Sequence, residues 1–184
     1  MSIDRFLAAS ENAMAREDWY SVLALSLTIP EICASCVSPN ETSRKRYTAW
    51  WKIYMEPIYT MKSGPVDQIS THVFLTANDA YALRCSFLHS GTDVIDGQRA
   101  QEVLTRVRFI GPVAAGDRRL HRIQDGSVLH LNVLCFGIEV VTAVRSWLHD
   151  ICSDRDICAR LSGLIDIHER IDGPPDFGPR IRFT

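Results

Sequence analysis

The sequence predicts a mainly α fold, an antiparallel helical bundle with a small antiparallel β-hairpin or ribbon inserted near residues 104–133. Apolar residues recur at helical spacing before this insertion, alternation with period two lies within it, and helical character returns from Leu134 to about Ile151. The chain has 184 residues, of which 46% are hydrophobic and 23% charged, as expected for one globular domain. We therefore expect a single domain over residues 1–171 and an irregular tail over residues 172–184, where prolines and glycines are frequent.

The first part of the chain predicts two helices. The stretch from Ile3 to about Arg16 mixes apolar and polar residues as an amphipathic helix does, whereas Trp19 to Ile29 is apolar on nearly every side. A helix that is apolar all round is typically a buried one. Pro30 either kinks this second helix or opens a new one. The uncharged apolar stretch that ends at Pro30 is shorter than the roughly 20 residues that a bilayer span requires.

Charge and cysteine content indicate where the protein works. The chain carries 20 lysines and arginines against 22 acidic residues, a net charge of −2, so it has no global basic field that would hold nucleic acid. The stretch from Met1 to Arg5 lacks the apolar core of a signal peptide. We expect a cytoplasmic protein without a membrane partner, in which the six cysteines are reduced thiols.

A third helix is predicted from Glu41 to Met55. Its beginning is basic and its remainder is aromatic, with the aromatic side chains at i, i+3, i+4 and i+7 on a single face. The basic residues are Arg44, Lys45 and Arg46, and the aromatic residues are Tyr47, Trp50, Trp51 and Tyr54. Together they could form a stacking and phosphate-binding surface for single-stranded nucleic acid. The alternative is a solvated charge run beside an aromatic stripe that belongs to the core.

The rest of the chain predicts a fourth helix, the β insertion and two late helices. Residues 60–72 look like a loop, and Thr76 or Asn78 can cap a helix that runs to about His89 and ends before Gly91. A short helical turn is expected from about Gln98 to Leu104. After the insertion we expect the helix from Leu134 and a short one over residues 155–165.

Arg84 is out of place on the predicted fourth helix. Steps of about 100° put Asp79, Ser86 and Ser90 on one polar face, which we expect to be solvated, and put Arg84 about 140° away among apolar residues. An arginine there needs a partner, a route to water or a role at an interface. Glu31 or Asp18 could pair with it, leaving His89 as a C-terminal cap of the helix. Because Arg84 and His89 also lie about 140° apart, only a second copy of the helix would bring them together easily.

The string Arg84-Cys85-Ser86-Phe87-Leu88-His89 resembles the Arg-x4-His motif of the HEPN superfamily, whose members are compact helical bundles. The wider stretch from Asn78 to Asp93 is similar to a group of bacterial proteins. The resemblance as a bundle covers residues 1–100 and 134–165, and the insertion between them is an elaboration.

This resemblance implies a homodimer whose two motifs face each other across the interface. Catalytic members cleave RNA without a metal ion, which implies that His89 transfers protons and that Arg84 holds the phosphate. Tyr81 and Asp93 would be supporting residues. Other members are non-catalytic modules that bind a nucleotide or a protein partner, and this remains the alternative.

No metal or cofactor is predicted. Cys33 and Cys36 form a Cys-x-x-Cys pair, but a zinc site needs a second pair and a redox site needs a βαβ context. Two small apolar residues on a buried helix account for them. The six histidines include no pair at i, i+4 on one predicted helix, and the chain has no glycine-rich phosphate loop.

Overall fold

A computed structural model describes residues 2–65, 69–112, 120–165 and 167, and confirms the mainly α fold. The helices of the described residues are α1 (Ser2–Ala15), α2 (Trp19–Val37), α3 (Ser43–Tyr54), α4 (Ala77–Ser90), α5 (Val133–Asp150) and α6 (Arg155–Ser162). The strands are β1 (Thr60–Ser63), β2 (Ser70–Val73), β3 (Arg106–Ile110), β4 (Ile123–Asp125) and β5 (Val128–Asn132). The tail expected from residue 172 lies outside the described residues.

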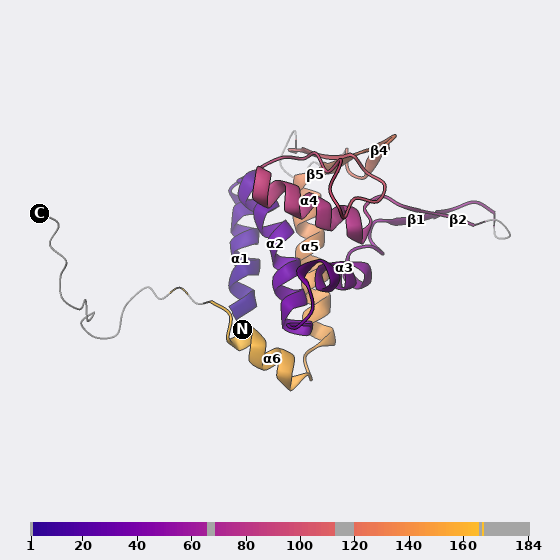
Figure 1. Ribbon diagram of the computed structural model, residues 1–184. Coiled ribbons are helices and arrows are strands. Elements are labelled where there is room, and N and C mark those ends of the chain that lie inside the picture. Colours follow the sequence, from indigo (N-terminus) through magenta and orange to yellow (C-terminus); the bar gives the residue numbers. More distant parts are fainter. Residues whose placement is uncertain (1, 66–68, 113–119, 166, 168–184) are drawn as a thin grey trace, which may run out of the picture.

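Helix α2 is the centre of the bundle and packs against α1, α3 and α5 (Figure 1). Asp18 caps its first turn, and the helix runs through Pro30 to Val37, so Pro30 does not open a new helix. Helix α2 is long enough and apolar enough to cross a membrane, but the core helix of a soluble protein also meets this criterion of length and composition. In this fold its contacts with three neighbouring helices bury more than half of it.

The aromatic stripe of α3 belongs to the core. Tyr47, Trp50 and Trp51 are at most 3% exposed, and the rings of Tyr47 and Trp51 stack with centroids 5.7 Å apart. Trp51 also packs against Phe136 of α5, with 6.4 Å between the ring centroids. These rings are therefore not an exposed surface on which nucleobases could stack.

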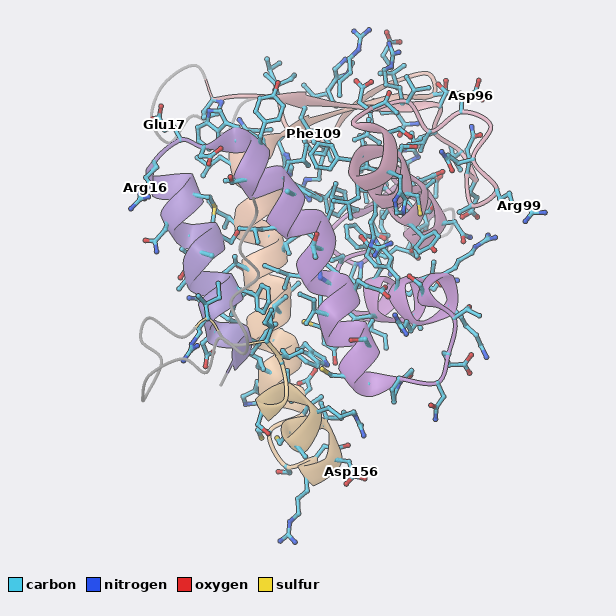
Figure 2. All side chains as sticks on the ribbon, turned by 60° about the vertical axis from the view of Figure 1, so that its left-hand side comes forward. Arg16, Glu17, Asp96, Arg99, Phe109 and Asp156 are labelled. Carbon is cyan, nitrogen blue, oxygen red and sulfur yellow. The ribbon has the colours of Figure 1, made fainter. Side chains whose placement is uncertain are left out.

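The inserted strands form a mixed sheet in the order β3-β5-β4, which covers the end of the bundle where α5 begins (Figure 1). Strands β4 and β5 form the expected antiparallel hairpin, but β3 pairs with β5 in parallel, from Arg106 opposite Val128 to Ile110 opposite Asn132. The alternation of apolar and polar residues predicted where strands occur, but it carries no information about whether two strands pair in parallel or antiparallel. Phe109 of β3 lies between the sheet and the helices, 5.4 Å from the ring of Phe136 (Figure 2).

Two local predictions between the helices are wrong. Strands β1 and β2 form an antiparallel hairpin where we expected a loop, and it projects from the bundle (Figure 1). Its strands have four residues each, too few to show a clear alternation. The helical turn expected from Gln98 to Leu104 is absent; one backbone hydrogen bond from Gln101 N–H to the carbonyl of Gln98 closes a turn instead.

Candidate functional site on helix α4

Helix α4 carries the Arg-x4-His string and is fixed at both ends as its sequence predicts. The hydroxyl of Thr76 accepts a hydrogen bond from the N–H of Asp79 at 3.1 Å, which caps the first turn. Gly91 follows the last turn with a φ of +64°, a left-handed conformation that favours glycine. The helix packs against α3 and α2, so one side of it is buried and the other faces outward.

Two of the three polar residues that we expected on the solvated face of α4, Asp79 and Ser86, lie on its buried face, whereas Ser90 is exposed as expected. Asp79 and Ser86 are both 0% exposed. The carboxylate of Asp79 accepts hydrogen bonds from the backbone N–H groups of Glu102 at 2.7 Å and Val103 at 3.2 Å. The expectation is wrong because this carboxylate takes its partners from a distant segment of the chain instead of from water.

The opposite side of α4 forms a stripe that is partly open to solvent. Its members lie at i, i+3, i+4 and i+7, and we call it the outward stripe. It consists of Tyr81, Arg84, Cys85 and Leu88. The first three are half-buried and Leu88 is 39% exposed. Residues at this spacing share one face of a helix, so the stripe presents apolar surface around a single positive charge.

Arg84 has neither of the carboxylate partners that the sequence suggested. Glu31 forms an ion pair with Arg46 at 2.5 Å, and Asp18 accepts hydrogen bonds from Ser21 at the start of α2. Among the described residues no acidic group pairs with Arg84. Its Nε atom is buried and has no hydrogen-bond partner.

Two tyrosine rings flank the Arg84 guanidinium. Its Cζ atom lies 5.8 Å from the ring centroid of Tyr47 and 5.9 Å from that of Tyr81, within the range of a cation–π interaction. Burial raises the pKa of Tyr47 well above its usual value, while the nearby positive charge of Arg84 acts in the opposite direction. Tyr47 therefore stays a neutral phenol and does not cancel the arginine charge.

His89 lies in the last turn of α4 and is exposed. Its imidazole has no hydrogen bond to a described residue, so both ring nitrogens are available to a ligand. Asp93, the other expected supporting residue, forms an ion pair with Arg106 at 3.4 Å. Tyr81 is thus the one expected supporting residue that contacts Arg84 in the single chain, and Arg84 and His89 occupy different sides of α4.

The three basic residues at the start of α3 are largely engaged within the protein. Lys45 pairs with Glu41 at 2.6 Å, and Arg46 pairs with Glu31. Arg44 donates hydrogen bonds to the carbonyl of Arg99 at 3.4 Å and to the side chain of Asn78 at 3.2 Å. Arg44 therefore ties α3 to the beginning of α4, and its guanidinium is the one of the three that has no carboxylate partner among the described residues.

A cluster of Tyr59, His121 and Glu139 was not predicted from the sequence, because its members come from three distant segments. The Tyr59 hydroxyl donates to Glu139 at 2.6 Å, and Nε2 of His121 lies 2.9 Å from the other carboxylate oxygen. Nδ1 of His121 accepts from the N–H of Asn132 at 3.2 Å, so Nε2 carries the proton. Because both of its ring nitrogens are hydrogen-bonded, His121 holds Glu139 and the end of β5 in position. A cavity of about 250 Å³ adjoins the cluster.

Replacing Tyr59 with phenylalanine is expected to destabilise the fold. The change removes a buried hydrogen bond to a carboxylate, worth about 1.5–3 kcal/mol. For a chain of this size we expect Tm to fall by roughly 3–12 °C. Thermal unfolding followed by circular dichroism measures the change. Tyr20→Phe is the control, because Tyr20 is 82% exposed and should unfold at the parent temperature. Equal Tm values for Tyr59→Phe and the parent would show that the cluster does not stabilise the fold.

The Cys-x-x-Cys pair lies in the hydrophobic core of the bundle. Cys33 and Cys36 are at most 3% exposed on α2, and burial raises the pKa of both thiols. In the described part of the chain, no group of three or more histidine, cysteine or acidic side chains could hold a metal ion. The pair therefore behaves as small apolar residues in the core.

No protein-family model matches this chain, and neither a curated protein nor a solved structure matches it. The chemistry available to α4 therefore has to follow from its own residues and their surroundings. Helix α4 carries an arginine that has no counter-charge among the described residues, and an exposed histidine five residues further along. The apolar residues of the outward stripe lie beside this arginine.

Proposed function

We propose that this chain is a HEPN-like, metal-independent endoribonuclease that acts as a homodimer through the outward stripe of α4. The observation that carries the proposal is the unpaired guanidinium of Arg84, which is half-buried between Tyr47 and Tyr81. A partly buried charge without a counter-charge is unfavourable. A phosphate group would supply the missing negative charge, and its oxygens match the planar donors of arginine.

The position of the two motif residues on α4 supports the proposed dimer. Arg84 and His89 are about 140° apart around one helix, so they do not converge within one chain. If two outward stripes pack across a two-fold axis, Arg84 of each chain comes close to the second copy of His89. The stripe suits such packing because Leu88 is 39% exposed and its neighbours at helical spacing are half-buried.

The residues fit cleavage of RNA by its own 2′-hydroxyl. This oxygen attacks the adjacent phosphorus, a new bond forms to the 2′ oxygen, and the bond to the 5′ oxygen of the next nucleotide breaks. One histidine of the dimer accepts the 2′ proton and the other protonates the departing 5′ oxygen. Arg84 stabilises the negative charge that develops on the phosphate oxygens. The products are a 2′,3′-cyclic phosphate and a 5′-hydroxyl, and no metal ion takes part.

A non-catalytic module is the second candidate, in which the same face binds a nucleotide or a protein partner. It is favoured by the pairing of Lys45 and Arg46 with carboxylates, which leaves little free positive charge beside the site for a long RNA. In that case the Arg84 guanidinium would bind a single phosphate or carboxylate, and His89 would contribute a hydrogen bond.

Incubation with a mixed-sequence single-stranded RNA in EDTA tests the proposal. We expect the parent chain to cleave it and to leave 2′,3′-cyclic phosphate ends. Leu88→Asp places a charge in the outward stripe and should give a monomer that no longer cleaves. Ile53→Asp is the matched control, because Ile53 is a 64% exposed apolar residue of α3 outside the stripe.

The outcomes of this assay separate the candidates. Loss of both dimer and cleavage in Leu88→Asp, with both retained in Ile53→Asp, supports the nuclease. A monomeric Leu88→Asp chain that cleaves like the parent contradicts the dimeric site. RNA or nucleotide binding by the parent without cleavage favours the non-catalytic module.

A further inference from the structure

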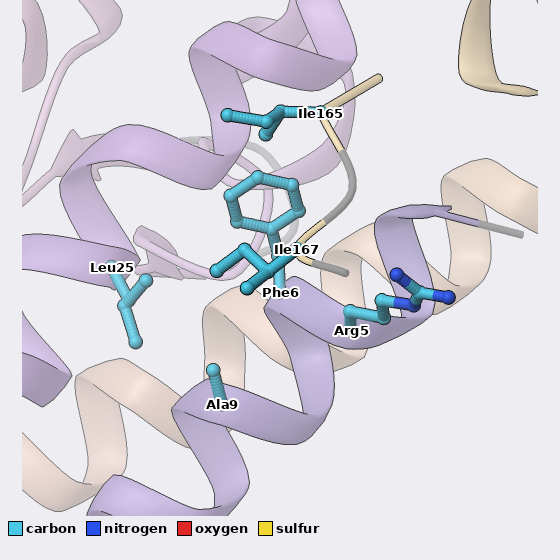
Figure 3. Close-up of a pocket in the computed structure, with 6 residues that line it drawn as sticks. All are labelled: Arg5, Phe6, Ala9, Leu25, Ile165 and Ile167. Carbon is cyan, nitrogen blue, oxygen red and sulfur yellow. The ribbon is translucent and has the colours of Figure 1, made fainter. Parts of the chain in front are cut away.

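Two hollows border the first half of α2. The larger has a volume of about 580 Å³ and lies between α1 and α2, where its lining residues are Arg5, Phe6, Ala9, Leu25, Ile165 and Ile167 (Figure 3). Apart from one arginine its walls are apolar and carry a single aromatic ring, so they favour no particular ligand. The smaller hollow has a volume of about 250 Å³ and lies where α2, β3 and α5 meet.

Aromatic side chains form the walls of this smaller hollow, which we call the aromatic hollow. Its lining residues are Trp19, Tyr20, Leu23, Phe109, Gly111 and Val133. Three of the six carry aromatic rings and none carries a charge. The hollow is smaller than the pockets of roughly 300–1,000 Å³ that hold drug-sized ligands. Its volume and lining therefore suit a single uncharged ring system.

The rings of the aromatic hollow do not stack on one another. Phe109 lies at the end of the bundle where α2 begins, and it packs on Phe136 with 5.4 Å between the ring centroids (Figure 2). In the described part of the chain no aromatic ring contacts Trp19 or Tyr20, although both line the same hollow as Phe109. Trp19 is half-buried and Tyr20 is 82% exposed, so a ligand can reach both from solvent.

Gly111 keeps the hollow open beside Trp19. A Cβ atom at position 111 would lie 3.8 Å from both Cδ1 and Nε1 of the Trp19 indole, which is ordinary van der Waals contact. A longer side chain at this position would extend over the indole. The indole N–H of Trp19 and the hydroxyl of Tyr20 make no hydrogen bond to a described residue. The site thus offers ring surface together with a few polar atoms.

We propose that the aromatic hollow binds one base of a single-stranded RNA. A nucleobase has a flat face that stacks on aromatic side chains, and nitrogen and oxygen acceptors at its edge that match the Trp19 N–H. An aliphatic side chain of a protein partner would offer the indole no acceptor. Binding of a base does not require cleavage, so this proposal goes beyond the proposed reaction and stands apart from it.

The aromatic hollow lies toward the end of α4 that carries His89. The N–H of Val107 donates a hydrogen bond to the carbonyl of Asp93 at 3.0 Å, so β3 runs alongside the segment that follows α4. Asp93 is four residues after His89, which is at most about 14 Å of chain. Phe109 is two residues after Val107, or about 7 Å along the strand. A strand whose phosphate lies at α4 can therefore place a base in the hollow a few nucleotides away.

Tryptophan fluorescence of the full-length chain tests the proposal. The probe is a 2′-O-methyl hexa-adenylate, which lacks the attacking 2′-hydroxyl and cannot be cleaved. Trp19 is the accessible one of the four tryptophans, because Trp50, Trp51 and Trp147 are at most 3% exposed. A base that stacks on an indole quenches its emission, so we expect a saturable quench with the probe. Trp19→Phe should abolish this quench.

Two variants of the hollow measure its part in binding. Tyr20→Ala should weaken binding of the probe roughly 5- to 150-fold, the usual contribution of one stacking partner. Gly111→Leu should fill the hollow and cause a loss of similar size. Ile53→Ala is the matched control, because Ile53 is 64% exposed on α3 outside the hollow, and it should bind like the parent. Circular dichroism checks the fold of each variant.

A second hexamer, with the same phosphates but no bases, separates the base from the backbone. A saturable quench by hexa-adenylate alone, weakened by the two variants of the hollow and not by the control, supports the proposal. No quench, a quench that persists in Trp19→Phe, or an equal response to the abasic hexamer overturns it. A stronger quench by N-acetyl-phenylalanine amide than by hexa-adenylate also overturns it, in favour of a protein side chain. Because the probes cannot be cleaved, failure of the nuclease proposal leaves this test unaffected.

Discussion

Replacing His89 with alanine is expected to lower RNA cleavage by about 10²–10⁴-fold, the usual contribution of a general acid or base. Replacing Arg84 with alanine should give a loss of similar size, because the phosphate charge then has no guanidinium to stabilise it. The fold should tolerate His89→Ala, since this side chain is exposed and has no hydrogen bond to a described residue. Initial rates of cleavage in EDTA, with circular dichroism of each variant, measure both effects.

His149→Ala is the matched control for His89→Ala. His149 also lies in the last turn of a helix, and its side chain is 90% exposed. The His149→Ala variant should cleave RNA at the parent rate. A His89→Ala variant that cleaves as fast as the parent, or a His149→Ala variant that loses as much activity, would exclude His89 as the proton-transfer group. Arg84→Lys separates charge from shape, because lysine keeps the charge but not the planar pair of donors.

Features that depend on neighbouring residues were predictable from the sequence. Thr76 and Gly91 mark the two ends of α4, and both ends were predictable because a capping hydroxyl and a left-handed glycine act within one helical turn. The aromatic stripe of α3 is buried because its spacing matches the helical period. The partly exposed position of Arg84 opposite a buried face follows from the same period, once the buried face is known.

Features that depend on distant partners were not predictable. Asp79 looked like a solvated residue because its hydrogen-bond donors, the N–H groups of Glu102 and Val103, lie more than 20 positions further along the chain. The parallel pairing of β3 with β5 depends on the path of the connection and not on the alternation of either strand. The same reason applies to the Tyr59, His121 and Glu139 cluster, in which no two residues are close in sequence.

Asp79→Ala is expected to cause the largest loss of stability of any change considered for this chain. Asp79 is 0% exposed, and its carboxylate accepts hydrogen bonds from the N–H groups of Glu102 and Val103 and from the Thr76 hydroxyl. Alanine leaves these three donors, which are partly buried against α4, without their acceptor, which costs about 3–5 kcal/mol in total. It also removes a negative charge from the first turn of α4, where the helix dipole favours one.

Urea unfolding of Asp79→Ala measures this loss, and Asp96→Ala is its control. Asp96 lies on the loop between α4 and β3 and is exposed, so its removal should change the free energy of unfolding by less than about 0.5 kcal/mol. Asp79→Asn should fall between the two, because the amide keeps one acceptor oxygen for the loop. If Asp79→Ala unfolds at the same urea concentration as Asp96→Ala, the carboxylate does not hold residues 102 and 103 against α4. The outward stripe would then owe its orientation to the packing of α4 on α3 and α2 alone.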